Sequence, residues 1–330
     1  MGHTTLGSCR GAQSARDLRA GLYIPTLQFP FNPRKPGMIK SLVALAAVAA
    51  CACTAASADT LQKIAESGKI TLAYRESSAP FSYLEGASKA TGFSVEIGNA
   101  VVEAVKKKLN KPTIEVGTLA VTSQNRIPLL VNGTIDLECG STTNNSARGK
   151  EVAFAVNYFY TGTRLLTKKS SGIKDYADLA KKTLATTTGT TNAQVMRKYN
   201  EDKKLDMDII FGKDHSDSML LVDGGRALAF AMDDILLFGL IANAKNPAEW
   251  EVVGEPLQVE PYACMVRKDD PAFKALVDGV ITGMMKSGEF EKLYTKWFMS
   301  PIPPKGTNLN LPMSQQLKDN LKAFSDKPAT

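Results

Sequence analysis

The feature that most limits the fold of this chain is a regular alternation of strand-like and helix-like segments from residue 69 onward. Short apolar runs such as KITLAYR (69–75) alternate with amphipathic stretches such as SVEIGNAVVEAVKKKL (94–109). In the latter, apolar residues recur at the spacing of one helix face. This alternation is typical of α/β proteins, in which helices cover a largely parallel sheet.

The alternation forms two series, of which the first is interrupted by the second. The expected strands are 69–75, 113–119, 134–140, 183–189, 207–213, 226–232 and 260–268, with a long extended run at 156–169. The expected helices are 59–69, 94–109, 123–133, 173–182, 190–200, 215–225, 233–245 and 270–298, the last broken at Gly288. This order predicts a discontinuous first lobe, 59–160 plus 262–330, and a second lobe, 161–261, joined by two crossing strands. Ligands of such open sheets bind beyond the carboxyl ends of the strands.

The positive charge of the chain is concentrated in its leader. Of the +7 net charge, residues 1–58 carry +5, from six bases and one acid, which leaves +2 for the rest. No basic stripe with interleaved aromatic residues follows, so nucleic acid is not an expected partner.

The leader itself has the pattern of a secretory signal. It begins at Met38, has a cation at Lys40, is apolar over 42–50 and ends in Ala-Ser-Ala at 56–58. We therefore predict a signal peptide at 38–58, treat 1–37 as a gene-model extension, and expect a periplasmic protein. The apolar run is far shorter than the roughly 20 residues of a membrane span, and no other segment reaches that length, so no transmembrane span is expected.

A second interpretation of the leader concerns Cys51. The sequence Val48-Ala49-Ala50-Cys51 also fits a bacterial lipobox, in which Cys51 would be acylated and anchor the protein. Cleavage after Ala58 is favoured because Ala-Ser-Ala directly precedes the helix expected at 59–69. Cys139 and Cys264 are then the only cysteines of the mature chain, and in an exported protein they are a candidate disulfide. Two buried, unreacted thiols are the alternative.

Several kinds of chemistry find no support in the sequence. His215 is the only histidine after the leader, and there is no HExxH motif, Cys/His cluster or EF-hand loop. There is also no GxGxxG after a strand, no Walker loop and no GxSxG elbow. We therefore expect no metal, no cofactor and no catalytic motif.

Polar residues instead collect where strands end. In LECGSTTNNSARGKEVAF (137–154), a strand runs into hydroxyls and amides followed by Arg148. Such a loop is either a solvated turn or a cradle for a small anion. The candidate residues in this loop are Ser141, Thr143 and Arg148. Comparable groups at other strand ends are Arg75, Ser123, Arg126, Thr188, Thr191, His215, Asp233 and Asp234. Singly, each has a simpler explanation, such as a helix N-cap for Asp233. Together, three arginines, several hydroxyls and an acidic pair predict an anion site between the two lobes.

These segments make the chain recognisable from about residue 59 to 304. It resembles the substrate-binding components of amino-acid ABC transporters, most closely the periplasmic glutamate/aspartate-binding proteins. The resemblance lies in TSQNRIPLLVNGTIDLECGSTTNNSARGKEVAF, GTRLLTKK, TTTGTT, AFAMDD, ACMVRKDDP and KWFMSPIPPK. It implies a type II periplasmic-binding-protein fold, with two lobes, two hinge strands and the ligand in the interdomain cleft. In this fold, the strand ending in Cys139 neighbours the strand carrying Cys264, which favours the disulfide.

The resemblance also implies a role for each ligand residue. Ser141, Thr143 and Arg148 would bind the α-carboxylate, and Asp233 the α-ammonium. Arg75, Ser123, Arg126 and His215 would surround the side-chain carboxylate, while Thr188 and Thr191 would close from the second lobe. Many relatives have an acidic residue where this chain has Ala147, a departure that affects the helix start more than the ligand. Three arginines suit a ligand with two carboxylates, because a neutral ligand would leave Arg75 and Arg126 buried without a partner, at a cost of several kcal/mol.

The implied function is a monomeric receptor that delivers glutamate or aspartate to an inner-membrane ABC permease with its ATPase, without catalysis. One alternative is a dehydratase-type enzyme on the same fold, for which His215 or Asp233 would have to be the general acid. The other is a sensory amino-acid-binding module, which a fused transmembrane or kinase segment would indicate. The sequence has neither.

Overall fold

The computed structural model describes residues 59–329. The expected start at Met38, the extension 1–37, the signal peptide 38–58 and Cys51 lie outside the described residues. Among the helices of the described part, none is both long enough and apolar enough to cross a membrane.

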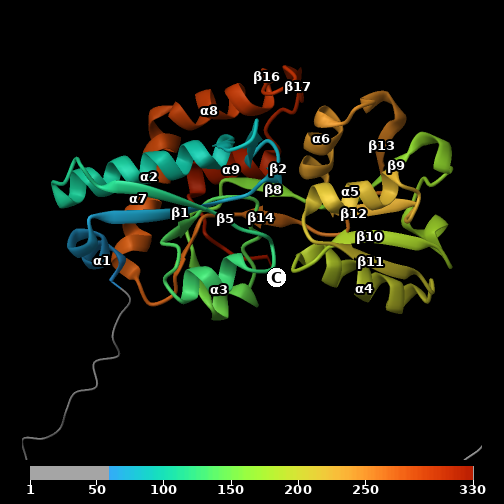
Figure 1. The fold of residues 1–330 in the computed structure, drawn as a ribbon, viewed down its shortest axis with the longest axis horizontal. Coiled ribbons are helices and arrows are strands. Elements are labelled where there is room, and N and C mark those ends of the chain that lie inside the picture. Colours follow the sequence, from blue (N-terminus) through green and yellow to red (C-terminus); the bar gives the residue numbers. More distant parts are fainter. Residues whose placement is uncertain (1–58, 330) are drawn as a thin grey trace, which may run out of the picture. The chain divides into compact units, whose positions relative to one another are not determined.

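The first lobe is built on a five-stranded mixed sheet. Its order is β5 (Glu115–Ala120), β1 (Lys69–Tyr74), β6 (Leu137–Glu138), β15 (Met265–Arg267) and β7 (Val152–Phe154). Strand β1 is parallel to β5 and β6, whereas β15 is antiparallel to both of its neighbours. Helix α2 (Phe93–Leu109) covers one face of the sheet and α3 (Arg126–Val131) the other (Figure 1). The parallel strands therefore end at one edge, where Arg75 follows β1.

The second lobe repeats this plan. Its sheet has the order β11 (Asp208–Gly212), β10 (Thr183–Thr187), β12 (Ala229–Asp233), β9 (Thr163–Lys168) and β13 (Trp250–Val253). Helix α4 (Thr191–Lys203) packs on one face, and α5 (His215–Asp223) and α6 (Asp234–Asn243) pack on the other (Figure 1). Strands β10 and β12 are parallel, so Thr188 and Asp233 lie at the same edge.

Two short antiparallel strands connect the lobes, β8 (Phe159–Thr161) and β14 (Glu260–Tyr262). The chain leaves the first sheet through β8 and returns through β14. Phe159 and Tyr262 pack edge-on against Phe81 of the first lobe, with ring centroids 4.9 and 5.1 Å apart. Burial of these aromatic rings fixes the crossings to the first lobe. The lobe boundaries at 160/161 and 261/262 remain a prediction.

The rest of the chain adds helices to the first lobe and two small sheets. The helices are α1 (Thr60–Ser67), α7 (Pro271–Ser287), α8 (Glu289–Phe298) and α9 (Gln315–Ala323). The small sheets are β2 (Ser77–Ser78), β3 (Ser82–Glu85) and β4 (Lys89–Thr91), and β16 (Pro301–Ile302) with β17 (Thr307–Asn308). Short 3-10 helices occur at η1 (Arg148–Lys150), η2 (Lys169–Ser171), η3 (Tyr176–Leu179) and η4 (Pro247–Glu249). The break predicted at Gly288 is present, since this residue adopts φ +78° between α7 and α8.

Two predicted elements are wrong in detail. The helix expected at 173–182 is only the 3-10 turn η3, because Tyr176 and Leu179 are buried while Lys181 already adopts φ +59°. The single strand expected at 260–268 is divided into β14 and β15, because its first half pairs with β8 and its second with the first sheet.

The predicted disulfide is confirmed. Cys139 follows β6, and Cys264 directly precedes β15, which pairs with β6. Their sulfur atoms are bonded, with Cα atoms 4.3 Å apart, and both residues are buried. The alternative of two unreacted thiols is therefore wrong.

Candidate functional site

A small cavity lies where the strand ends of the two lobes meet. Its lining is Ser123, Arg126, Ser141, Thr143 and Arg148 from the first lobe and Thr190, Thr191, Asn192, His215, Met232, Asp233 and Leu236 from the second. Eight of the ten predicted ligand residues are among them; Arg75 and Thr188 are not. The cavity volume is about 10 Å³, room for roughly one water molecule. The lobes are therefore closed on each other, and an amino acid enters only when they part.

Arg75 lies directly behind the cavity and is fully buried. Its Nη2 donates to Asp214 Oδ1 at 2.5 Å and lies 3.3 Å from His215 Nε2. Its Nε and Nη1 have no hydrogen-bond partner. A buried guanidinium normally satisfies all its N–H groups, so Arg75 lacks acceptors for Nε and Nη1 in the closed form.

His215 is neutral in this setting. Burial, followed by the charge of Arg75, lowers the pKa of His215 to about 3. Because a guanidinium can only donate, Nε2 accepts from Arg75 and the ring proton is on Nδ1, which contacts Thr187 Oγ1 at 3.0 Å. The ring therefore holds Arg75 in place without adding a charge.

Asp214 is a functional residue that the sequence analysis missed. It precedes α5 in the second lobe and accepts from Arg75 and from Ser77 Oγ at 2.8 Å, both of the first lobe. Burial would raise the pKa of Asp214, but the charge of Arg75 and the hydrogen bonds from Ser77 and Arg75 outweigh it and lower the pKa to about 2. An ionised Asp214 thus joins the lobes in the closed form.

Arg126 begins α3 and is also buried. Its Nη1 donates to Thr142 Oγ1 at 2.5 Å, and that hydroxyl donates to Glu138 Oε2 at 2.7 Å. Burial, then the neighbouring charges of Arg148 and Arg75, lower the pKa of Arg126 to about 9. Its Nε has no partner, and neither have the hydroxyls of Ser123 and Ser141.

Arg148 bridges the lobes through backbone carbonyls. Its Nη1 donates to Thr143 O at 2.9 Å, and its Nη2 contacts Gly189 O at 3.4 Å in the second lobe. The side chain is half-buried, and loss of hydration lowers its pKa, although the carboxylates of Glu260 and Asp233 act in the opposite direction. Within residues 59–329, neither Arg126 nor Arg148 forms an ion pair.

Two buried carboxylates bound one end of the cavity: Asp233 lines it, and Glu260 lies behind the lining hydroxyls of Thr143 and Thr191. Asp233 accepts from Asn192 Nδ2 at 2.7 Å and from the Tyr262 hydroxyl. Burial, and then Glu260, raise the pKa of Asp233 well above its usual value, although the bonds from Tyr262 and Asn192 lower it. No lysine or arginine of the described residues pairs with Asp233 or Glu260. This end of the cavity suits a cation that comes with the ligand.

Thr188 and Thr191 occupy different positions at the start of α4. Thr191 lines the cavity, whereas Thr188 directs both its N–H and its hydroxyl to Gly212 O, at 3.0 and 3.2 Å. The hydrogen bonds of Thr188 are therefore used within the second lobe. Asp234 is also bound elsewhere, accepting from Thr161 Oγ1 at 2.6 Å.

Gly189 marks a close backbone approach between the lobes. It adopts φ +78°, and a Cβ at this position would lie 2.6 Å from Gln124 Cα. Only glycine has both the conformational freedom and the lack of a side chain that this contact requires.

We expect Gly189→Ala to hinder closure and weaken ligand binding, because backbone atoms of Gln124 cannot move aside as a flexible side chain can. Small-angle scattering at saturating ligand should show less compaction than in the wild type. Gly172→Ala is a matched control, since Gly172 also has a positive φ but nothing lies within 4 Å of its Cβ position. Equal compaction of both variants would contradict this expectation.

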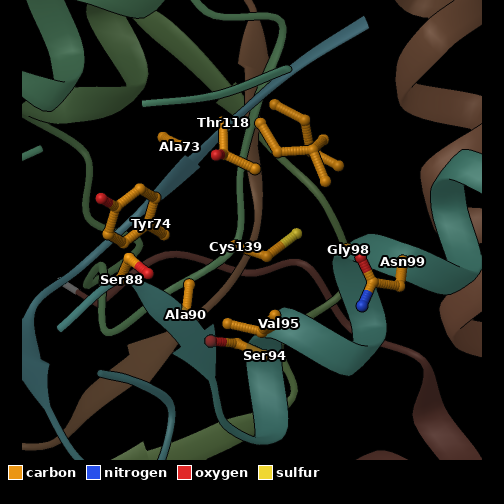
Figure 2. A pocket seen from close by; sticks show the side chains of 12 residues that line it. Ala73, Tyr74, Ser88, Ala90, Ser94, Val95, Gly98, Asn99, Thr118 and Cys139 are labelled. Carbon is orange, nitrogen blue, oxygen red and sulfur yellow. The ribbon is translucent and has the colours of Figure 1, made fainter. Parts of the chain in front are cut away.

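A larger cavity in the first lobe lacks the charges of this site. It has a volume of about 230 Å³ and lies between β1, β5 and α2. Figure 2 shows Tyr74, Ser94, Asn99 and Thr118 among the side chains around it. None of its lining residues is charged, so it offers no counter-charge for an anion. In residues 59–329, no group of three or more His, Cys, Asp or Glu side chains is placed to hold a metal ion.

Comparison with known proteins finds solute-binding proteins for amino acids. Residues 70–300 match the family model described as bacterial extracellular solute-binding proteins, family 3. The chain is 52% identical over 296 residues to the glutamate/aspartate import solute-binding protein of Escherichia coli K12, covering 89% of this chain and 98% of that one. It is also 52% identical over 294 residues to the L-glutamate/L-aspartate-binding protein of Pseudomonas aeruginosa, covering 88% and 97%.

Solved structures of amino-acid-binding proteins share the fold. A mutant of ArgBP from T. maritima is 25% identical with a TM-score of 0.64, covering 72% of this chain and 98% of that one. The ancestral amino acid-binding protein AncCDT-1, described as a precursor of cyclohexadienyl dehydratase, is 26% identical with a TM-score of 0.62, covering 73% and 99%.

Proposed function

The chain belongs to the bacterial extracellular solute-binding proteins, family 3, and we propose that it captures L-glutamate or L-aspartate in the periplasm and delivers it to an ABC transporter. Of the relatives with about half of their residues identical, two are import solute-binding proteins for these two amino acids and one is a binding protein for them. Its activity is therefore binding and release, not catalysis.

The observation that carries this proposal is that most of the buried polar atoms without a hydrogen-bond partner belong to predicted ligand residues. Seven buried side-chain nitrogen or oxygen atoms in the described residues have no hydrogen bond, and five of them belong to Arg75, Ser123, Arg126 and Ser141. Leaving such groups unpaired costs about 1–3 kcal/mol each, and more where the group is charged. A ligand carboxylate accepts from several of these donors at once and removes this cost.

The distribution of charge favours an acidic amino acid over other anions. The first lobe provides Arg75, Arg126 and Arg148 for two carboxylates, and Asp233 with Glu260 provides the counter-charge for one ammonium. A neutral amino acid has only one carboxylate and would leave the Arg75 end of the site unneutralised. We assign Arg148, Ser141 and Thr143 to the α-carboxylate end and Arg75, Arg126, Ser123 and His215 to the side-chain end, with Thr191 closing the site.

The alternative of a dehydratase-type enzyme needs a general acid, and His215 does not suit this role. With a pKa of about 3, this imidazole is neutral at physiological pH and has no proton to spare for a leaving group. The sensory alternative has no observation in its favour, since the relatives are import proteins.

Calorimetric titration of the mature protein with each of the twenty amino acids tests the proposal. We expect saturable binding of one glutamate or aspartate per chain, and much weaker binding of neutral and basic amino acids. Preference for a neutral or basic amino acid would refute the proposal. All ligands should be titrated in randomised order against one preparation, so that loss of active protein with time is not mistaken for a difference in affinity between ligands.

The affinity for glutamate should also increase with pH. The pKa of Asp233 is raised by burial and by Glu260 in the ligand-free protein, whereas an ammonium beside it favours the ionised form. Ligand binding therefore expels a proton, and the affinity rises as pH increases toward the raised pKa of Asp233. Binding heats in two buffers of different ionisation enthalpy measure the released proton. Asp233→Asn should weaken binding and abolish this pH dependence; an unchanged pH profile in this variant would count against the assignment.

A further inference from the structure

Glu260 is a buried carboxylate to which the family resemblance gave no role. It is the first residue of β14, is fully buried and does not line the cavity. Its Oε2 accepts from the hydroxyls of Thr143 and Thr191, each at 2.5 Å. Its Oε1 accepts from Thr163 Oγ1 at 3.3 Å and from the Gln258 amide. Both oxygens are thus surrounded by donors.

These bonds determine which way two cavity hydroxyls point. Oε2 of Glu260 accepts from both hydroxyls, and each threonine has a single hydroxyl proton. Thr143 and Thr191 must therefore both direct that proton to Glu260. Toward the cavity they then present lone pairs, which can accept from a ligand but cannot donate to it.

The two hydroxyls also come from different lobes. Thr143 lies in the loop after β6, and Thr191 is the first residue of α4, yet their Oγ1 atoms are 3.4 Å apart. Both line the cavity together with Asp233. Only the closed form brings the two hydroxyls to the same carboxylate.

We propose that Glu260 is a positioning residue that turns the hydroxyls of Thr143 and Thr191 toward itself, so that both offer only acceptors to the ligand ammonium. Recognition of the ammonium then depends on both lobes and on closure. This inference rests on the proposed function, because it takes the ligand to be an acidic amino acid. Thr143, which we placed near the α-carboxylate, contacts the carboxylate only through its backbone in this arrangement.

The test compares glutamate with 2-hydroxyglutarate, in which a hydroxyl replaces the ammonium. Glu260→Gln introduces an NH2 group that donates, so that one threonine hydroxyl turns its proton toward the cavity. Glutamate affinity should fall roughly 10- to 100-fold, because an ammonium cannot accept that proton. A ligand hydroxyl can accept as well as donate, so 2-hydroxyglutarate should lose much less affinity than glutamate does. The ratio of the affinity for glutamate to that for 2-hydroxyglutarate should therefore fall by about tenfold. Glu251→Gln is the matched control, because Glu251 does not line the cavity and pairs with Lys174, with 2.7 Å between Oε1 and Nζ. This variant should leave the preference for glutamate over 2-hydroxyglutarate unchanged.

Variants of Thr191 test whether Glu260 acts by orienting the threonine hydroxyls or only by its charge. Thr191→Val should narrow the same preference, whereas Thr191→Ser, which keeps the hydroxyl, should restore it. If Glu260 acts through these hydroxyls, Thr191→Val should have a smaller effect in the Glu260→Gln background than in the wild type. Additive effects in this double-mutant cycle would overturn the proposal.

The possible outcomes distinguish this inference from the function on which it rests. If the wild type binds neither glutamate nor aspartate, the proposed function fails. If the wild type binds glutamate but Glu260→Gln weakens both ligands by the same factor, the positioning role is wrong. Should Glu260→Gln fail to fold, the two Thr191 variants keep the carboxylate and decide alone: equal losses for both ligands in Thr191→Val would refute it.

Discussion

Replacing Arg148 with alanine should abolish binding of every amino acid, whereas Arg75→Ala should selectively weaken acidic ones. Arg148 lies beside Thr143 and Gly189, at the end assigned to the α-carboxylate that all amino acids share. Loss of one member of a buried charge pair costs about 3–5 kcal/mol, or roughly two to four decades of affinity. Titration with glutamate, aspartate and glutamine should give losses of this size for all three ligands.

Arg75→Ala should give a different pattern. Its unpartnered Nε and Nη1 lie at the end assigned to the side-chain carboxylate, which glutamine lacks. Glutamate and aspartate should therefore lose affinity strongly, while glutamine loses less or gains. Because this change also leaves Asp214 without its ion pair, Arg75→Ala should be repeated with Asp214→Asn, which removes the uncompensated charge.

Arg164→Ala provides a matched control for both variants. Arg164 binds the carbonyls of Gly254 and Val252 within the second lobe and contributes nothing to the cavity lining. It should not alter affinity for any ligand. Should Arg75→Ala and Arg148→Ala weaken glutamate and glutamine by the same factor, the assignment of a separate side-chain pocket is incorrect.

The sequence allowed most of the cavity lining to be predicted because of a simple property of parallel sheets. Polar residues after β1, β6, β10 and β12 lie far apart in the chain, but the carboxyl ends of parallel strands share one edge. Ser141 after β6 and Asp233 at the end of β12 therefore lie on opposite walls of the same cavity. The motif resemblance then assigned a role to each of them.

Among the residues that the sequence did not identify are acidic groups with distant partners. Asp214 precedes a helix and looks like an ordinary N-cap, but its partner Arg75 is 139 residues away. Glu260 lies in a hinge strand, and its bond to Thr143 spans 117 residues. Only the packing of the lobes shows that these carboxylates are buried.

Helices and strands were predicted correctly where the pattern of apolar residues extends over many residues, and incorrectly where the segment is short. The 17-residue α2 has a continuous apolar face and was located to within one residue. The segment 173–182 has too few residues for such a pattern, and burial of Tyr176 and Leu179 is satisfied by a single turn. The strands β2, β3 and β4 have only two to four residues each, which is too short for a recognisable alternation of apolar and polar residues.

Removing the Cys139–Cys264 disulfide should cause the largest loss of stability of any change considered. The bond spans 125 residues, and the loop that it closes in the unfolded chain includes the whole second lobe. In the chain-entropy model, closing a loop of this size contributes up to about 4–5 kcal/mol. Cys139→Ala/Cys264→Ala should lower the free energy of unfolding by up to that amount in urea titrations of the ligand-free protein.

The denaturant slope identifies the origin of this loss. A cross-link makes the unfolded state more compact, so its removal should increase the surface exposed on unfolding and raise the m-value. Wild-type protein reduced before unfolding should match the double variant in both stability and slope, which controls for lost packing around the sulfur atoms. Alkylation of unfolded, unreduced wild type should label neither cysteine, and two labelled thiols would disprove the bond. A loss of stability with an unchanged m-value would instead place the effect in the folded state, because the bond would then act by holding β6 next to β15 rather than by restricting the unfolded chain.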